Sequence, residues 1–227
     1  MICATIYVKE ATTLKKSIYG VTLSDAVVKA VDERARKLGI SRSALINQIL
    51  AEKLSCVTPE MRMNEIFDSI ETIVDGIISA QHQRSASLLT MRTSLEYKYR
   101  PTISYKVELD RVPSEFVGTL RVQIRTQSEQ LTDLFNSFFL YRIKFERGRF
   151  AEMGIEFPEC ELSSGKFVRR LRKPRSIIIE DDGMAIAEYI KDLDFAIKTF
   201  LADHSGFGSV AQELEKKTAS TLSTYRL

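Results

Sequence analysis

The sequence predicts an α+β protein with an N-terminal strand–helix–helix unit, a long connecting helix and a small C-terminal α+β domain of element order ββαββα. Three observations indicate this class. Between Lys16 and Leu54 the apolar residues first alternate and then recur every three or four positions, which is typical of a strand followed by helices. A helical pattern then runs through residues 61–98, and after Pro101 two pairs of alternating segments are each followed by a helical one. The expected parts span residues 1–57, 58–100, 101–204 and 205–227.

Composition excludes membrane and secreted classes of protein. The 227 residues are 44% hydrophobic and 28% charged, as in ordinary globular proteins. No apolar run approaches the roughly 20 residues that a membrane-spanning helix needs. The first residues, MICATIYVKE, lack the basic start and apolar core of a signal peptide. We therefore expect a cytoplasmic protein with no membrane partner.

Residues that usually carry catalysis or bind metals are sparse. The three cysteines form no CxxC pair, and His82 and His204 lack further metal-type ligands at helical spacing, so we expect no metal site and no cofactor. Motifs of P-loop proteins, dinucleotide-binding proteins, zinc proteases and α/β-hydrolases do not occur in the sequence. The acidic triplet Glu180-Asp181-Asp182 is more simply explained by a turn and a helix N-terminus than by an active site. We therefore expect that the protein is not an enzyme.

The segment KSIYGVTLSDAVVKAVDERARKLGISR, residues 16–42, changes its periodicity twice. Residues 17–24 alternate apolar side chains with polar or small ones, which predicts a half-buried strand. Ser24 can then begin an amphipathic helix, which ends at Gly39, where a left-handed residue is favourable. Ser41 can cap a second helix that extends to about residue 54.

This segment needs a partner to fold. A single strand must pair its backbone N–H and C=O groups, and some 40 residues bury too little apolar surface to be stable alone. Both requirements are met if two copies pair their strands antiparallel and interleave their helices. We therefore expect an obligate homodimer, with a higher oligomer also open.

The strand IYGVTLS, the helix SDAVVKAVDERARKLG and the helix ISRSALINQILAEKL resemble the ribbon-helix-helix family of DNA-binding proteins, which includes MetJ-, Arc- and CopG-like repressors. The turn LGISRSALI is the most specific part. The resemblance covers residues 16–54. It implies a homodimer that binds double-stranded DNA, such as a transcriptional repressor or regulator or a plasmid-type DNA-binding factor.

The resemblance also implies which residues contact DNA. Outward strand positions read base edges in the major groove; here they are Lys16, Ile18, Gly20 and Thr22. The start of the second helix holds phosphate, and here it is Ser41, Arg42 and Ser43. Because Ile18 and Gly20 offer no polar group to a base edge, three modes stay open. In the first mode the protein recognises the shape and the phosphates of DNA. In the second the N-terminal arm, residues 1–15, supplies the contacts to DNA. In the third the ribbon-helix-helix unit serves only for dimerisation.

The connector, residues 58–100, has little to break a helix between residues 61 and 98 except Gly76. Apolar residues recur at helical spacing up to Ala80, and a second apolar stripe begins at Leu88. We expect an amphipathic helix that packs against the dimer mate or the C-terminal domain.

The C-terminal domain begins with two half-exposed strands at residues 102–110 and 119–126, followed by a helix from Ser128 to near residue 148. The segments KFVRRLRK and SIIIEDD are expected as strands, and the imperfect alternation of the first indicates an edge strand. A final helix is expected from Met184 to about residue 204. The remainder, residues 205–227, is expected to be a mobile tail, and a short helix through VAQELEKK stays open.

The C-terminal domain also holds a basic cluster, although the net charge of the chain is only +3. We interpret this cluster as a possible anion-binding site or as a solvated face. Its members are Lys166, Arg169, Arg170, Arg172, Lys173 and Arg175. The main hypothesis is a DNA-binding regulator whose C-terminal domain binds an unknown ligand or protein or oligomerises. The alternative is a dimeric interaction or scaffold protein that does not read DNA and acts through its C-terminal domain.

Overall fold

The computed structural model describes residues 20–54, 56–78, 83–96, 100–112, 114–174, 179–202, 211–225 and 227, without the side chains of 179–181. The chain divides into two compact units, Met1–Thr58 and Pro59–Leu227. No helix in the described part is long and apolar enough to cross a membrane.

The first unit contains two helices, α1 (Asp25–Leu38) and α2 (Arg42–Lys53), as predicted. Helix α1 ends because Gly39 takes a left-handed conformation with φ 65°. The N–H groups of Gly39 and Ile40 then bond to the carbonyls of Arg36 and Ala35, at 3.3 and 3.1 Å. This arrangement satisfies carbonyls that the helix end would leave free, and it turns the chain toward Ser41.

The predicted ribbon strand is not seen. Residues 20–24 have no regular secondary structure, while Lys16, Ile18 and the arm of residues 1–15 lie outside the described residues. A strand obtains its hydrogen bonds from a neighbouring strand, and the described part of this unit contains none.

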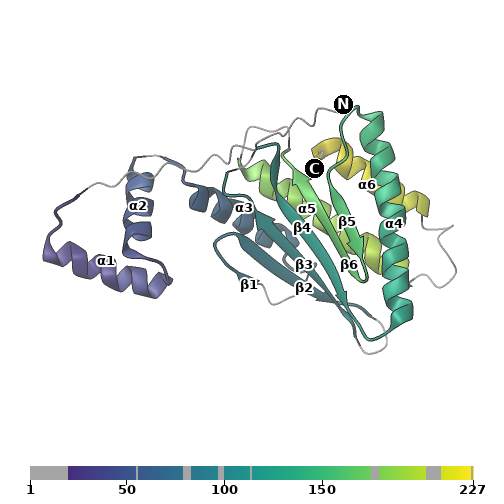
Figure 1. Ribbon diagram of the computed structural model, residues 1–227, viewed down its shortest axis with the longest axis horizontal. Coiled ribbons are helices and arrows are strands. Elements are labelled where there is room, and N and C mark those ends of the chain that lie inside the picture. Colours follow the sequence, from purple (N-terminus) through teal and green to yellow (C-terminus); the bar gives the residue numbers. More distant parts are fainter. Residues whose placement is uncertain are drawn as a thin grey trace, which may run out of the picture. The chain divides into compact units, whose positions relative to one another are not determined.

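The second unit is built on one sheet (Figure 1). Its elements are α3 (Pro59–Val74), β1 (Gln83–Arg84), β2 (Leu88–Ser94), β3 (Thr102–Leu109), β4 (Phe116–Arg125), α4 (Glu129–Glu152), β5 (Cys160–Ser163), β6 (Lys166–Arg172), α5 (Ile179–Ala202) and α6 (Ala211–Tyr225). The six strands are antiparallel and follow the order β1-β2-β3-β4-β6-β5. The predicted α+β class is confirmed, and residues 101–204 follow the predicted order ββαββα as β3-β4-α4-β5-β6-α5.

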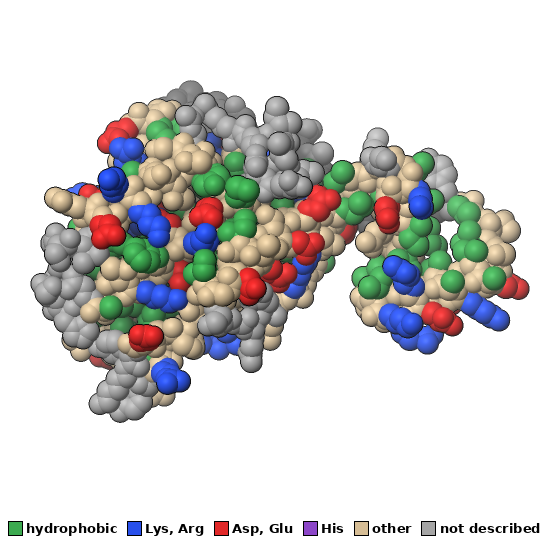
Figure 2. All heavy atoms as spheres, turned by 180° about the vertical axis from the view of Figure 1, so that it is seen from behind, with side chains coloured by type: hydrophobic (Ala, Val, Ile, Leu, Met, Phe, Trp, Pro, Cys, Tyr) green, Lys and Arg blue, Asp and Glu red, His purple; other side chains and the backbone are tan. Residues whose placement is uncertain are grey.

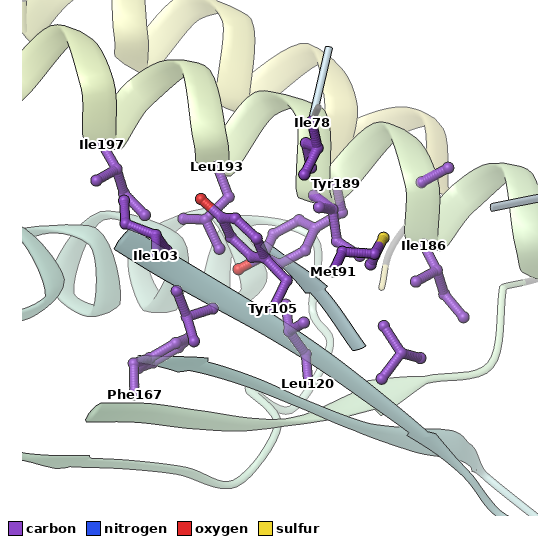
Figure 3. Close-up of a cluster of buried hydrophobic side chains, with 14 of the residues drawn as sticks. Ile78, Met91, Ile103, Tyr105, Leu120, Phe167, Ile186, Tyr189, Leu193 and Ile197 are labelled. Atoms are coloured by element: carbon purple, nitrogen blue, oxygen red, sulfur yellow. The ribbon is translucent and has the colours of Figure 1, made fainter. Parts of the chain in front are cut away.

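The core lies between the sheet and its helices, with α3 and α5 packed side by side (Figure 1). Figure 3 shows Ile103 and Tyr105 of β3 directed toward Leu193 and Ile197 of α5. All four side chains are fully buried. The Tyr105 hydroxyl donates to Asp194 Oδ1 at 2.9 Å, since a buried hydroxyl needs a partner.

The predicted connecting helix is shorter than expected. Helix α3 ends at Val74. Gly76 adopts a left-handed conformation with a φ of 73°, in which a right-handed helix cannot continue. Residues 83–84 and 88–94 then form β1 and β2. In β2 the residues Leu89, Met91 and Thr93 share one buried face, and Thr90 of the other face is buried as well, so the stripe expected for a helix belongs to a strand. The expected connector is therefore part of the sheet.

Strand β6 is not the edge strand that was expected, since it lies between β4 and β5. Its imperfect alternation has another cause: Arg169 points to the buried side and is 0% exposed. The segment SIIIEDD differs as well, because α5 already begins at Ile179, and residues 175–178 lie outside the described part. The second strand pair of the domain is therefore β5 and β6.

The expected mobile tail contains helix α6, which packs on the unit through Leu214, Thr218 and Leu222. These buried side chains recur every four residues, which places them on one face of the helix. The short helix through VAQELEKK that the sequence left open is therefore present, and it extends to Tyr225.

Candidate nucleic-acid interface

The apolar side of the first unit is uncovered. The sequence had assigned these residues to the inner faces of two helices, yet all are exposed to solvent by 38% or more. They are Val27, Val28, Leu38, Ile49, Leu50 and Leu54. Figure 2 shows hydrophobic side chains on the surface of this unit. Among the described residues of this unit, only Ala35, Leu45 and Ala51 are buried.

The start of α2 is a helix N-terminus with free donors. The Ser41 side chain accepts a hydrogen bond from the Ala44 N–H at 3.2 Å, and the Ser41 carbonyl accepts one from the Leu45 N–H at 3.0 Å. The N–H groups of Arg42 and Ser43 lie in the first turn, where no helical carbonyl precedes them. Because Ser41, Arg42 and Ser43 are all exposed, an anion can approach these donors.

The Arg42 guanidinium is held by an acidic residue of α1. Its Nη2 donates to Asp32 Oδ2 at 2.6 Å, and its Nε pairs with the other carboxylate oxygen. The Arg42 side chain is nevertheless 68% exposed. Sequence reasoning missed Asp32, because a pair ten residues apart that bridges two helices leaves no periodic signal. The pair fixes the position of Arg42 but also neutralises part of its charge.

The two described positions that were predicted to face bases offer few polar groups. Gly20 and Thr22 are exposed, and no atom lies within 4 Å of the place where a Gly20 side chain would begin. Lys16 and Ile18 lie outside the described residues. The base-reading role of all four stays a prediction.

The basic cluster of the C-terminal domain is split between the two faces of β6. Arg169 is buried and donates to Glu146 Oε2 at 2.6 Å. Arg170 pairs with Asp110 at 2.7 Å, and Arg172 pairs with Glu115. Among the described members, Lys166 and Lys173 form no ion pair, while Arg175 lies outside the described residues. The structure therefore does not gather the cluster into one surface, and its anion-binding role stays a prediction.

Arg169 belongs to a buried polar network that joins β6 to α4, α5 and α6. Arg142 donates to Asp192 at 2.7 Å and to Thr218 at 2.6 Å. The Tyr189 hydroxyl donates to Glu146 Oε1 at 2.9 Å. Burial alone would raise the pKa of Glu146, but the guanidinium groups of Arg169 and Arg142 outweigh it and hold the pKa below its ordinary value. These interactions fix the helices and do not form a reactive site.

The described part of the chain holds no group of three or more His, Cys, Asp or Glu side chains that could bind a metal ion. His82 and His204 lie outside that part. Asp182 of the acidic triplet is 4% exposed and lies 3.7 Å from Arg62 of α3, within the first turn of α5. This position agrees with the helix N-terminus that the sequence indicated.

The first unit thus combines two helices joined by a left-handed glycine turn, free N–H groups at the start of the second helix and an uncovered apolar side. In the comparison with protein families, residues 20–55 match the family described as "Ribbon-helix-helix protein, copG family". This segment is therefore a ribbon-helix-helix domain. Such a domain implies a DNA-binding regulator. The match leaves the second unit unassigned, and no catalytic family matches the chain.

Comparisons with curated proteins and with solved structures gave no match.

Proposed function

We propose that the protein is a homodimeric DNA-binding regulator that acts as a transcriptional repressor or as a plasmid-type DNA-binding factor. The observation that carries the proposal is the family match over residues 20–55. Proteins of this kind place a ribbon of two paired strands in the major groove. On this chain the ribbon comprises residues 16–24 of both copies, and Lys16, Ile18, Gly20 and Thr22 face the bases.

The uncovered apolar side of α1 and α2 supports the dimer. Contiguous apolar surface on a small unit is costly in water and commonly marks an interaction site. Leu38, Leu50 and Leu54 are each more than half exposed, which a unit with few buried residues tolerates poorly. A second copy covers this surface and supplies the strand partner in one step.

The N-terminus of α2 supplies the phosphate contact. Free N–H groups at Arg42 and Ser43 point toward an approaching anion, and the dipole of the helix favours negative charge there. Such contacts fix the position of the protein on the duplex and carry no sequence information.

A salt series tests the proposal. The full chain is titrated into a fluorescent duplex between about 50 and 200 mM salt, and affinity is expected to fall steeply because bound phosphates release counterions. Sedimentation of the same mixture is expected to give two chains per bound duplex. Affinity that does not depend on salt, or a bound monomer, would contradict the proposal.

The alternative is a dimeric scaffold protein that acts through its second unit. It is favoured by the weak chemistry at Gly20 and Thr22 and by the pairing of Arg42 with Asp32. Selection of duplexes from a random pool separates the two functions. Recovery of a shared sequence motif excludes the scaffold, whereas absence of any retained DNA favours it.

A further inference from the structure

The sheet of the second unit has an outer face, which we define as the side opposite to Tyr105 and Phe167. The pairing register of the strands determines which residues lie on this face. Arg92, Ser104, Gln123 and Lys166 are successive cross-strand partners on β2, β3, β4 and β6. Thr102 and Arg125 form the neighbouring pair on β3 and β4. On β4 the outward residues Arg121, Gln123 and Arg125 are exposed.

One end of this outer face carries cations that no acidic residue neutralises. Arg121 pairs with Glu108 and Arg170 pairs with Asp110, both toward the other end of the strands. In contrast, Arg92, Arg125 and Lys166 form no ion pair within the described part of the chain, and neither does Arg100 at the start of β3. The charge of this end is therefore available to an external anion.

A polar donor without a partner lies on the same face. Ser104 is only 4% exposed, and its hydroxyl has no hydrogen-bond partner among the described residues. The Nε atom of Arg92, its cross-strand neighbour, is also buried without a partner. Neither residue lines the cleft described next, although Gln123, the other cross-strand partner of Ser104, does.

A cleft of about 1000 Å³ opens at this end of the sheet. It is lined by Arg100 and Arg125, by Thr102 and Gln123 of the outer face, and by Gln127 and Gln130 at the start of α4. None of the described residues that line it is acidic, although Glu129 lies between two of them in the first turn of α4. The first turn of the 24-residue helix α4 adds the positive end of its dipole. Ligand sites are commonly clefts of up to about this size with a few convergent polar groups.

We propose that this cleft binds a small organic anion that carries two phosphate or carboxylate groups. The guanidinium groups of Arg100 and Arg125 each hold one anionic group, since a guanidinium pairs with either group through two parallel hydrogen bonds. The glutamine side chains and Thr102 orient the body of the ligand by hydrogen bonds. The ligand is expected to be small and not a long polyanion, because Arg100 and Pro101 bound the cleft on one side and the start of α4 bounds it on the other.

The site stands independently of DNA binding, and it differs from the anion site that the sequence had indicated on β6. Among the described members of that cluster, Lys166 alone lies at this end of the sheet with no ion pair. The cleft escaped sequence analysis because Arg100 and Arg125 lie 25 residues apart and converge only through the pairing of β3 with β4.

The test is calorimetric titration of the full chain, without DNA, at fixed ionic strength. Pyrophosphate probes the phosphate source and citrate probes the carboxylate source. Saturable binding of at least one probe is expected. Arg125→Gln should weaken it at least about tenfold, because a charge-assisted contact is lost.

Arg121→Gln is the matched control. It removes the same charge from the same strand and face, four residues away and outside the cleft. A change of less than about twofold is expected for it, since non-specific attraction is screened by salt. The proposal is overturned if neither probe binds the wild-type chain at millimolar concentration, or if Arg121→Gln weakens binding as much as Arg125→Gln does. Circular dichroism of both variants shows whether the fold is retained, and Arg125→Lys, which keeps the charge but not the planar fork, is used if Arg125→Gln is unfolded.

Discussion

At the scale of single residues, Asp32 limits the charge that the N-terminus of α2 presents. It holds the exposed Arg42 guanidinium through both carboxylate oxygens. An exposed ion pair contributes less than about 1 kcal/mol to folding, so its removal leaves the unit folded. Its effect on an approaching phosphate is larger, because Asp32 repels the phosphate and competes for Arg42.

Asp32→Asn is therefore expected to strengthen binding to duplex DNA by about threefold to tenfold, the equivalent of roughly 1 kcal/mol. Fluorescence anisotropy on the full chain measures the change. Glu33→Gln is the control, since it removes the same charge from the next residue, which is exposed. Equal gains for both variants would show that net charge alone acts and that the pair with Arg42 is irrelevant.

Arg42→Ala is expected to weaken binding by a similar factor on all duplexes, because a phosphate contact does not distinguish bases. Affinities for two unrelated duplexes and their salt dependence provide the measurement. A loss confined to one duplex would instead assign base reading to Arg42.

Glu146 links protonation to the stability of the second unit. Arg142, Arg169 and the Tyr189 hydroxyl contact its carboxylate, Asp192 pairs with the same Arg142, and the pKa of the Glu146 carboxyl is lowered in the fold. An unfolded chain takes up the proton near pH 4.3, whereas the folded chain resists it. The contribution of Glu146 to stability is thus complete above that pH and is lost as pH falls through the lower folded pKa.

Glu146→Gln should lower the free energy of unfolding at pH 7 by about 3–5 kcal/mol, because Arg142 and Arg169 lose their shared counter-charge. The difference from wild type should shrink between pH 5 and about pH 3, which urea unfolding at several pH values measures. Glu161→Gln on the exposed side of β5 should change stability by less than about 0.5 kcal/mol at pH 7. If the difference in the free energy of unfolding between Glu146→Gln and wild type did not change with pH, protonation of Glu146 would not be linked to stability.

At the scale of elements, the packing of α3 on α5 depends on Gly183. A side-chain carbon placed there would lie 2.7 Å from Ser69 Cβ and 2.9 Å from the Ile66 carbonyl oxygen of α3. Both distances are below van der Waals contact, so the helices could keep their approach only if one of them shifted.

Gly183→Ala is expected to destabilise the second unit by about 1–3 kcal/mol, as overpacking usually does. Gly148→Ala in α4 is the control, since no atom lies within 4 Å of the new carbon. There the gain in helix propensity should stabilise by roughly 0.5–1 kcal/mol. Thermal denaturation measures both changes. A lower melting temperature for Gly183→Ala together with a higher one for Gly148→Ala would support the close approach of α3 and α5, and shifts in the same direction would refute it.

Elements whose side chains repeat at one clear period were predictable from sequence. The alternation around Tyr105 located β3, and the apolar stripe through Leu193 located α5. Strand β2 was missed because LLTMRTS contains adjacent leucines that fit a helical stripe as well as a strand. The pairing of β2 with β3, which no local pattern encodes, decides between the two.

At the scale of the whole molecule, the sites were less predictable than the elements. The N-terminus of α2 followed from local signals, namely a glycine stop and a serine cap, and the family match covers it. The partner of Arg42 and the cleft of Arg100 and Arg125 depend on residues that only the fold brings together. The basic cluster between Lys166 and Arg175 also did not predict a basic surface, since Arg169 is buried in the core.

The division of the chain at Thr58 predicts two thermal transitions. The second unit, Pro59–Leu227, buries its apolar core within one chain, whereas the first leaves an apolar side exposed. If pairing of two copies stabilises the first unit, a hundredfold rise in protein concentration adds about 2.7 kcal/mol per dimer of that unit and nothing to the second unit. Scanning calorimetry of the full chain should then show one transition that moves upward by several degrees and one that does not move. The matched control is a chain that begins at Pro59, which should keep only the fixed transition. A transition of that shorter chain that moves with concentration would place dimerisation in the second unit and favour the scaffold over the DNA-binding regulator.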